Sequence, residues 1–369
     1  MSLRYAVIGA GNGGYAMAAE LALLGRDPVL VDFPAFADRL APLSAAGGII
    51  VESRIDHFPG GVGMHFAPLT RLATDIAEVA DADVIIVVVP AQHHETVIAA
   101  VKPHLKGGQL VLLNPGGVGG ALLWRAALVE SGLADVLLAQ PSDLLYAGYR
   151  TNDGKVVVAD KKKRARLGTF PNINHRVVLD ILREDFPEFE PAANVLEAAM
   201  GGPGMLVHPL PMLMNAVRID RDSPFTYDAY DITPSVARAV EALDAERVAI
   251  IAALGGKPVP IKDVLTEYYG VTGETFYETV RKTPPYQGAA APRDFNHRYI
   301  SEEVPTQVVP SAAIGRQLGL ATPVMDATVA LASAVAGEDY ARAGWTSARL
   351  GINGLDALGI RELLETGRR

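Results

Sequence analysis

The sequence contains no cysteine, which excludes disulfide bonds, thiolate nucleophiles and cysteine-ligated zinc. Its eight histidines are scattered without an H-E-x-x-H spacing, and no G-x-S-x-G nucleophile elbow occurs. Apolar stretches are short: Val84–Ala91 is among the longest, whereas a membrane-spanning helix needs roughly 20 residues. We therefore expect no metal site, no serine hydrolase chemistry and no membrane association.

The charge balance is acidic, with a formal net charge of −9 at pH 7, so the chain as a whole repels nucleic acid phosphates and anionic lipids. The segment MSLRYAVIGAGNGG enters a predicted strand at once, without the pattern of a signal peptide. Hydrophobic residues make up 49% of the chain, as in ordinary globular proteins, and 369 residues exceed the usual size of one domain. These features predict a soluble, cytoplasmic, two-domain protein that does not bind nucleic acid.

The first half alternates short β-branched runs with helical patterns, which is typical of βαβ units in a doubly wound parallel sheet of the Rossmann type. The expected strands are Arg4–Ile8, Pro28–Asp32, Val84–Val89, Gln109–Asn114 and Val136–Ala139, with a helix over Tyr15–Leu24 that ends at Gly25. The segment Lys155–Phe170 predicts a late hairpin at the sheet edge. We expect its basic run, Lys161–Arg164, to be a solvated turn.

A domain boundary is expected at Phe186–Pro191, because the two prolines of FPEFEP break any regular element there. We place a dinucleotide-binding domain at residues 1–189 and a mainly α-helical domain at residues 190–369. The second half predicts helices over Pro234–Leu254, Ile261–Tyr269, Ala312–Leu318 and Val324–Val335, and a long loop over Arg281–Arg293.

The segment GAGNGG lies between a predicted strand and a predicted helix, the context in which G-x-G-x-x-G indicates dinucleotide binding. Gly9 would form the tight turn, Gly11 would admit the pyrophosphate, and Gly14 would let the helix pack closely on the strand. Asn12 and Gly13, between them, are expected to contact the cofactor, with helix N-terminal amides facing the phosphates. The alternative is a turn whose glycines serve only the fold.

Asp32 follows Gly11 by 21 residues and ends the second predicted strand. A carboxylate at this place accepts ribose hydroxyl groups and repels a 2′-phosphate, so NAD is the expected cofactor. Arg39 lies near enough in the sequence to leave NADP open.

Ligands of open α/β sheets bind at the carboxyl ends of the strands. We therefore expect Pro90 and Ala91, and Gly116 in the NPGG loop, to lie on the nicotinamide side of the cofactor. His93 and His94 follow the first of these loops, and we expect them to be solvated positions that open a helix.

His208 stands after a glycine-rich bend and before Pro209, which can open a helix. An imidazole titrates near neutral pH, so His208 is the candidate acid/base, with a purely structural histidine as the alternative. The string NHRYISEEVP carries Arg298, whose planar fork suits a substrate carboxylate, and glutamates that can fix a histidine tautomer. The alternative is a surface helix turn in which Arg298 pairs with Glu302.

The chain resembles the opine dehydrogenases of the octopine/nopaline type, which are related in architecture to ketopantoate reductases and 6-phosphogluconate dehydrogenases. The resemblance rests on GAGNGG, Asp32, NPGG, VHPLPMLMNA, TPSVARAVEALDAER, NHRYISEEVP and TPVMDA, and covers nearly the whole length. It implies that His208 is the acid/base, that Glu303 is its partner and that Arg298 binds a substrate carboxylate. We expect Asn215, in the same string as His208, to bind substrate too.

The sequence departs from the family pattern at two places. Glu303 stands where aspartate is common, and glycines stand at 201, 202 and 204 where an asparagine often precedes the histidine. A homodimer is expected from the resemblance alone.

The predicted reaction is the NAD(P)-dependent reductive condensation of an amino acid with a 2-keto acid through an imine, and its reverse. Two other functions stay open at this point. A ketopantoate-reductase-like enzyme would reduce a 2-keto acid without an amine, and a non-catalytic NAD-binding protein would keep GAGNGG without using His208.

Overall fold

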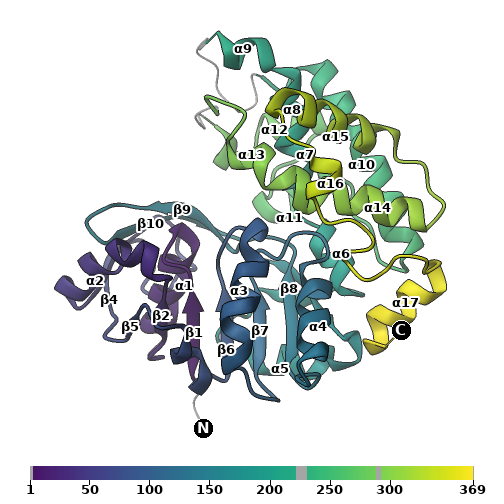
Figure 1. Cartoon of the computed structure of the whole chain (residues 1–369). Helices are drawn as coiled ribbons and strands as arrows, with labels where there is room; N and C mark the ends of the chain where they lie inside the picture. The colour runs from purple at the N-terminus through teal and green to yellow at the C-terminus, as the bar shows by residue number, and fades with distance from the viewer. Residues whose placement is uncertain (1–2, 222–230, 288–291, 369) are drawn as a thin grey trace. The chain divides into compact units, whose positions relative to one another are not determined.

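Short apolar runs of the first half form the strands of a largely parallel sheet in the computed structural model, which describes residues 3–221, 231–287 and 292–368 (Figure 1). The sheet has the strand order β12-β11-β8-β7-β6-β1-β2-β5. Its central strands are β1 (Tyr5–Ile8), β2 (Val29–Val31), β6 (Val84–Val87), β7 (Leu110–Leu113) and β8 (Leu137–Pro141). Every residue of β1, β6 and β7 is buried, so both faces of the sheet are covered. The predicted strands and the α/β fold class are confirmed.

A second sheet of four strands was not predicted. Its order is β4-β3-β10-β9, formed by β4 (Gly63–Pro68), β3 (Gly48–Ser53), β10 (Lys155–Lys161) and β9 (Tyr146–Arg150). Helix α1 (Asn12–Leu23) contacts strands of both sheets, and its residues from Gly13 to Ala22 are all buried. A helix covered on all sides needs no polar face, which explains its run of alanine and leucine.

The predicted hairpin over Lys155–Phe170 is wrong. Strand β10 belongs to the four-stranded sheet, whereas β11 (Ala165–Phe170) pairs with β8 and β12 in the large sheet. The basic run between them is not simply solvated either: Lys161 is 2% exposed, and its Nζ lies 2.5 Å from Glu20 Oε1 and 2.6 Å from Glu188 Oε1. The ammonium group is buried because two carboxylates neutralise it.

Two further segments differ from what the sequence predicts. FPEFEP does not break every regular element, since Phe189–Pro191 forms β12 at the edge of the large sheet, where a proline is tolerated. The predicted loop Arg281–Arg293 contains a short 3₁₀ turn at Pro284–Tyr286, and its residues 288–291 lie outside the described part.

The second half is mainly helical, as predicted. Its helices are α6 (Val195–Met200), α7 (Gly204–Val207), α8 (Pro209–Met214), α9 (Ala216–Asp220), α10 (Pro234–Ala253), α11 (Ile261–Tyr269), α12 (Phe276–Val280), α13 (Arg298–Ser301), α14 (Val309–Gln317), α15 (Pro323–Ala336), α16 (Tyr340–Ala343) and α17 (Ala357–Thr366). A π-helix, η7 (Val304–Val308), precedes α14. Helix α10 packs against six others, α6, α7, α8, α12, α14 and α15, and so forms the centre of this half. Thr233 caps its N-terminus ahead of Pro234.

The chain divides into two compact units. The first comprises residues 3–116 and 124–191, and the second comprises residues 117–123 and 192–368. The short segment 117–123 is bound into the helical unit by a hydrogen bond from Val118 N to Thr306 O of 2.8 Å. None of the helices in the described residues is both long and apolar enough to cross a membrane.

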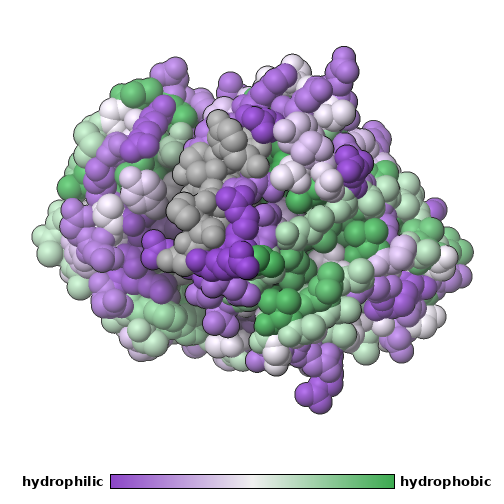
Figure 2. All heavy atoms as spheres, turned by 90° about the horizontal axis from the view of Figure 1, so that it is seen from above, coloured by the Kyte–Doolittle hydropathy of each residue, from purple (hydrophilic) through white to green (hydrophobic). Residues whose placement is uncertain are grey.

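Hydrophobic residues also reach the surface, where Figure 2 shows them gathered in patches among polar ones. In the helical unit the large exposed hydrophobic residues include Met214, Val217, Leu331 and Val335. Leu331 and Val335 lie one helical turn apart on α15, so this helix presents an apolar stripe to solvent.

Candidate functional site

The three glycines of the G-x-G-x-x-G turn differ in whether the fold itself needs them. Gly9 has φ +103°, and a Cβ there would lie 2.4 Å from Val88 O, while a Cβ at Gly14 would lie 1.7 Å from Gly9 O. The fold itself therefore demands glycine at both positions. At Gly11 φ is −86° and a Cβ would meet nothing within 4 Å. Neither backbone nor packing requires glycine at position 11, which fits a place kept open for a phosphate group.

Neighbouring residues of the turn have partners within the protein. A Cβ on Gly13 would lie 2.9 Å from side-chain carbons of Leu144 and Val88. Asn12 accepts a hydrogen bond from Arg150 N through its Oδ1 at 3.1 Å. Asn12 thus links the turn to β9 of the second sheet, and close packing leaves little room for a side chain at Gly13. The contact of both residues with a cofactor stays a prediction.

Asp32 is buried at the end of β2 and joins that strand to the glycine turn. Its Oδ2 accepts from Ala10 N at 2.9 Å and its Oδ1 from Phe33 N at 2.8 Å. Arg39 lies beside it, with Nη1 3.5 Å from Oδ2 and the guanidinium carbon 4.1 Å from the centre of the Phe36 ring. A carboxylate and a guanidinium therefore stand together at the position that is predicted to meet the adenosine ribose.

The loops after β6 and β7 contain the other residues predicted to meet the cofactor. Pro90 is exposed and precedes a 3₁₀ turn that begins with the buried Ala91. A Cβ on Gly116 would lie 2.3 Å from Gln140 Cδ, so any larger residue there would displace the buried Gln140 side chain. These three positions remain cofactor-contact predictions.

The two histidines after β6 differ from each other. His93 is exposed, as expected, but His94 is fully buried, and its Nδ1 accepts from Trp124 Nε1 at 3.3 Å. Burial lowers the pKa of His94 to about 4. The expectation of a solvated His94 is therefore wrong, because the first residue of α3 (His94–Val101) faces Trp124.

In the helical unit the structure brings His208 and Glu303 together. His208 lies between α7 and α8, and its Nδ1 is 3.1 Å from Glu303 Oε1. Their side chains are 17% and 3% exposed. A carboxylate only accepts, so Nδ1 carries the proton in this pair, and Nε2 of a neutral ring is then the basic nitrogen. This is the geometry of a histidine whose tautomer and orientation are set by an acid.

The carboxylate of Glu303 is itself held in place. Gln307, one turn later, donates from Nε2 to Glu303 Oε2. Gly204 lies on another side, where a Cβ would be 3.1 Å from Oε2 and 3.2 Å from Oε1. Glu303 directly precedes the π-helix η7, a kind of distortion that is frequent at functional sites. Although Glu303 is one methylene longer than the aspartate common at this position in the family, its carboxylate lies at hydrogen-bond distance from His208.

Arg298 opens α13 and lies beside this pair. Its Nε is 2.8 Å from Glu302 Oε2, and its Nη2 is 3.9 Å from Glu303 Oε1. The Arg298–Glu302 pair is the surface-turn alternative raised by the spacing, and the structure contains it. The guanidinium is half exposed next to the buried acids, so binding of a substrate carboxylate stays a prediction.

Tyr299 completes the cluster. Its ring is stacked on the imidazole of His208, with centroids 3.6 Å apart and planes 8° from parallel. His297 meets the same tyrosine edge-on at 4.4 Å, and its Nδ1 accepts from Tyr299 N at 3.3 Å. Burial, followed by the charges of Arg298 and His208, lowers the pKa of His297.

Asn215 is engaged by the backbone of its own region. Its Nδ2 donates to Pro211 O at 2.9 Å and to Asp231 O at 3.3 Å. This amide lies at the C-terminal end of α8 and links it to Asp231, and a substrate contact stays a prediction.

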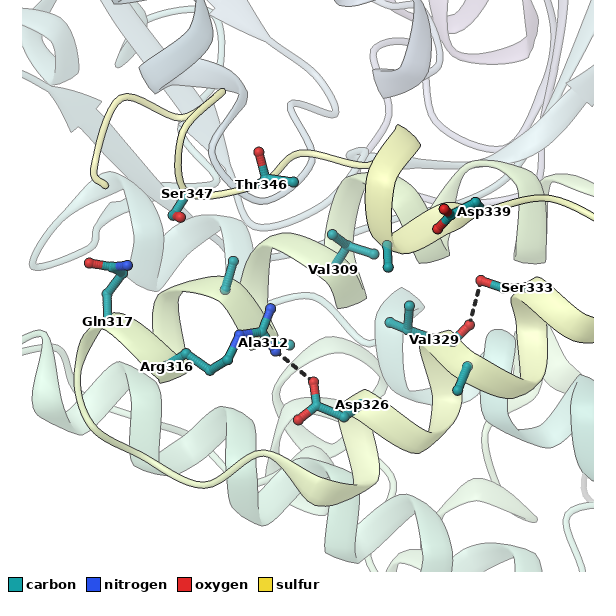
Figure 3. A pocket seen from close by; sticks show the side chains of 13 residues that line it. Val309, Ala312, Arg316, Gln317, Asp326, Val329, Ser333, Asp339, Thr346 and Ser347 are labelled. Atoms are coloured by element: carbon teal, nitrogen blue, oxygen red, sulfur yellow. Dashed lines mark hydrogen bonds and ion pairs between the residues drawn. The ribbon is translucent and has the colours of Figure 1, made fainter. Parts of the chain in front are cut away.

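A separate pocket of about 400 Å³ lies between α14, α15 and α16 (Figure 3). Figure 3 shows Val309, Ala312 and Val329 on its apolar part and the Arg316–Asp326 ion pair, 2.7 Å long, at one side. Its lining includes neither His208 nor Glu303. The pocket is therefore distinct from the histidine cluster.

Sequence reasoning proposed His208, Glu303 and Arg298 and missed two residues that hold them. Gln307 carried a weak signal, since it lies four residues after Glu303 and so on the same helical face. Tyr299 stood in the quoted string, but nothing in its spacing indicates a ring stack with a residue 91 positions away.

Two family models match the chain. The model described as "Ketopantoate reductase PanE/ApbA" matches residues 5–172, and "NAD/NADP octopine/nopaline dehydrogenase, alpha-helical domain" matches residues 191–336. The chain is 37% identical to the opine dehydrogenase of Arthrobacter sp. (strain 1C) over 365 residues, 99% of each protein. It is 24% identical to the octopine dehydrogenase of Pecten maximus over 404 residues, 97% of this chain and 99% of that protein.

Solved structures share the fold. Octopine dehydrogenase with NADH and L-arginine matches with a TM-score of 0.80 at 20% identity, covering 100% of this chain and 99% of that one. Yersinopine dehydrogenase with NADP⁺ matches with a TM-score of 0.73 at 16% identity, covering 99% and 98%. The resemblance drawn from the sequence is confirmed. With 37% identity over nearly its whole length, the chain belongs to the opine dehydrogenase family of NAD(P)-dependent oxidoreductases.

Proposed function

We propose that this chain joins an amino acid to a 2-keto acid by reducing the imine that forms between them. The observation that carries the proposal is the contact between His208 Nδ1 and Glu303 Oε1, in a chain that also contains the glycine turn at Gly9–Gly14. A proton-transfer group is what such a reduction needs besides a hydride donor, because the imine nitrogen must be protonated as its carbon is reduced.

His208 is the group assigned to move that proton. Glu303 accepts from Nδ1–H and keeps the ring in one tautomer, so that Nε2 is the nitrogen that exchanges the proton. The carboxylate also stabilises the imidazolium that exists between uptake and release. Gln307 keeps Glu303 in place by donating to its second oxygen.

Arg298 is assigned to hold a substrate carboxylate. Its Nε is engaged by Glu302 at 2.8 Å, while Nη2 is 3.9 Å from Glu303 and so beyond a direct hydrogen bond. A guanidinium presents five N–H donors, which suffices for an ion pair on one side and a carboxylate on the other. Asn215 is the second proposed substrate contact.

We assign cofactor binding to residues 1–189 and substrate binding and catalysis to residues 190–369. When bound, NAD(P)H supplies the hydride. Gly9, Gly11, Asn12, Gly13 and Gly14 would hold the pyrophosphate, and Asp32 would meet the adenosine ribose. Pro90, Ala91 and Gly116 are the proposed neighbours of the nicotinamide.

His208→Ala is the test, with NADH oxidation measured on pyruvate and a pool of amino acids. We expect a fall in turnover of roughly 10²- to 10⁴-fold, as for loss of a general acid/base, whereas His93→Ala, an exposed histidine, should keep wild-type turnover. Unchanged turnover of His208→Ala would contradict the role. NADH oxidation by keto acid without an amine would instead favour a ketopantoate-reductase-like activity. Binding of NADH without turnover of any substrate would favour a non-catalytic NAD-binding protein.

A homodimer is the proposed assembly. The stripe of Leu331 and Val335 on α15 is the apolar surface that supports it, since obligate dimer interfaces are enriched in such residues. Light scattering of Leu331→Asp against wild type tests this: a monomeric variant from a dimeric parent supports the face, and two equal masses refute it.

A further inference from the structure

The imidazole of His208 has two contacts that restrain it in different ways. Glu303 Oε1 lies 3.1 Å from its Nδ1. A single hydrogen bond of this kind leaves the ring free to rotate about the bond direction. Tyr299 adds a restraint of another kind, because its ring covers one face of the imidazole at a centroid distance of 3.6 Å and an angle of 8°.

Tyr299 is itself anchored, so that its ring is a fixed surface. It lies in the single turn α13, where its backbone N donates to His297 Nδ1 at 3.3 Å. The His297 ring also contacts it edge-on, with ring centroids 4.4 Å apart and planes at 78°. The next residue, Ile300, is fully buried and ties the turn to the core.

Resting on the proposed function, we propose that Tyr299 is a positioning residue for the reaction: its aromatic face holds the His208 ring at the angle at which the imidazole exchanges protons with substrate. The flat ring is what matters, not the hydroxyl group. Burial raises the pKa of Tyr299, so the phenol stays protonated near neutral pH and does not compete as an acid/base.

Two substitutions separate the ring from the hydroxyl. Tyr299→Phe keeps the flat face, and its kcat should stay within about twofold of wild type, whereas Tyr299→Leu removes the face and should lower kcat roughly tenfold. The KM for NADH should stay unchanged in both. Tyr277→Leu is the control, since Tyr277 is also a half-buried tyrosine of the helical unit and contacts Arg281.

Proton NMR of the His208 ring gives a readout that needs no turnover. The stacked Tyr299 ring should move the carbon-bound imidazole protons upfield, and His208→Ala identifies these signals by their loss. Tyr299→Phe should keep the upfield position and Tyr299→Leu should abolish it. Signals already at the usual histidine position in wild type would overturn the stack itself.

The kinetic outcomes also decide the proposal. A loss in Tyr299→Phe as large as in Tyr299→Leu would assign the effect to the hydroxyl and overturn the positioning role. Full activity in Tyr299→Leu would overturn it as well. If wild type fails to couple amine and keto acid but shows the ring-current shift, the proposed function fails while the restraint on His208 stands.

Discussion

A methyl group added at Gly204 tests whether the room at this position is matched to the length of Glu303. An ideal Cβ would lie 3.1 Å from Oε2, 3.2 Å from Oε1 and 3.4 Å from Cδ of Glu303. The first two contacts are tighter than side chains normally make, so the carboxylate must move by a few tenths of an ångström. Gln307 holds Oε2 of that carboxylate by a hydrogen bond. We therefore expect the contact between Oε1 and His208 Nδ1 to lengthen.

The size of the effect follows from that contact. A hydrogen bond to a charged group contributes about 1.5–3 kcal/mol, and losing roughly half of it corresponds to about a 4- to 13-fold fall in kcat. Glu303→Asp withdraws the carboxylate by one C–C bond, about 1.5 Å, and should cause a loss of at least this size. In the double variant the shorter acid leaves space for the methyl group, so the two losses should not add.

The assay is kcat for amine-dependent NADH oxidation in wild type, both single variants and the double variant. Gly359→Ala is the matched control, because Gly359 also lies in the first turn of a helix, α17, and its added Cβ would make only ordinary contacts of 3.4 Å. Wild-type kcat in Gly204→Ala, or losses that multiply in the double variant, would refute the matching of Gly204 to Glu303.

Three further predictions concern the first unit. Lys161→Met should lower the free energy of unfolding by about 3–5 kcal/mol, since it leaves the carboxylates of Glu20 and Glu188 without their buried cation. Lys163→Met, exposed in the same basic run, should change it by less than about 0.5 kcal/mol in the same urea titration. Because the pKa of His94 falls from 6.5 to about 4 on folding, the native state binds fewer protons than the unfolded chain between these values, and stability falls as the pH falls. The loss between pH 7 and pH 5 should be about 2 kcal/mol, and His94→Gln should remove it in urea unfolding at the two pH values; an unchanged pH dependence contradicts the assignment. Arg39→Gln leaves Asp32 without its guanidinium neighbour, so kcat/KM should fall for NADPH by roughly tenfold relative to NADH; an equal fall for both cofactors contradicts this.

The parallel sheet could be predicted because its signal is local. The strands β6 and β7 read VIIV and LVLL, and each residue is buried because both sheet faces are covered. Among the elements of the described residues, no other gives four consecutive β-branched or leucine residues between turn signals. The glycine turn could be predicted for the same reason. Gly9 and Gly14 are required by close contacts with Val88 and Gly9, residues that lie just after the ends of β6 and β1.

The four-stranded sheet could not be predicted in the same way. Strand β4 reads GMHFAP, with exposed positions and a proline, and only its partner β3 defines it as a strand. Strand β3 in turn pairs with β10, where Ile50 lies opposite Lys155. The burial of Lys161 likewise depends on Glu20, 141 residues away. Pairings at this separation leave no trace in a local pattern.

The histidine site lies between these cases. His208 and Glu303 are 95 residues apart, and spacing alone left a structural histidine open. The family resemblance supplied the pairing, and the structure supplies its distance. The stacking of Tyr299 and the room at Gly204 depend on side-chain packing, which neither residue type nor spacing encodes.

The segment at residues 117–123 has a consequence for how this protein can be dissected. Because it belongs to the helical unit and precedes the rest of that unit in the chain, no single cut yields two whole pieces. A fragment ending near residue 191 would expose Val118, Ala121 and Leu122, which are buried in the intact protein. During synthesis the helical unit must likewise wait for Thr306 before the Val118 amide finds its acceptor, so the last third of the chain completes a structure begun in the first.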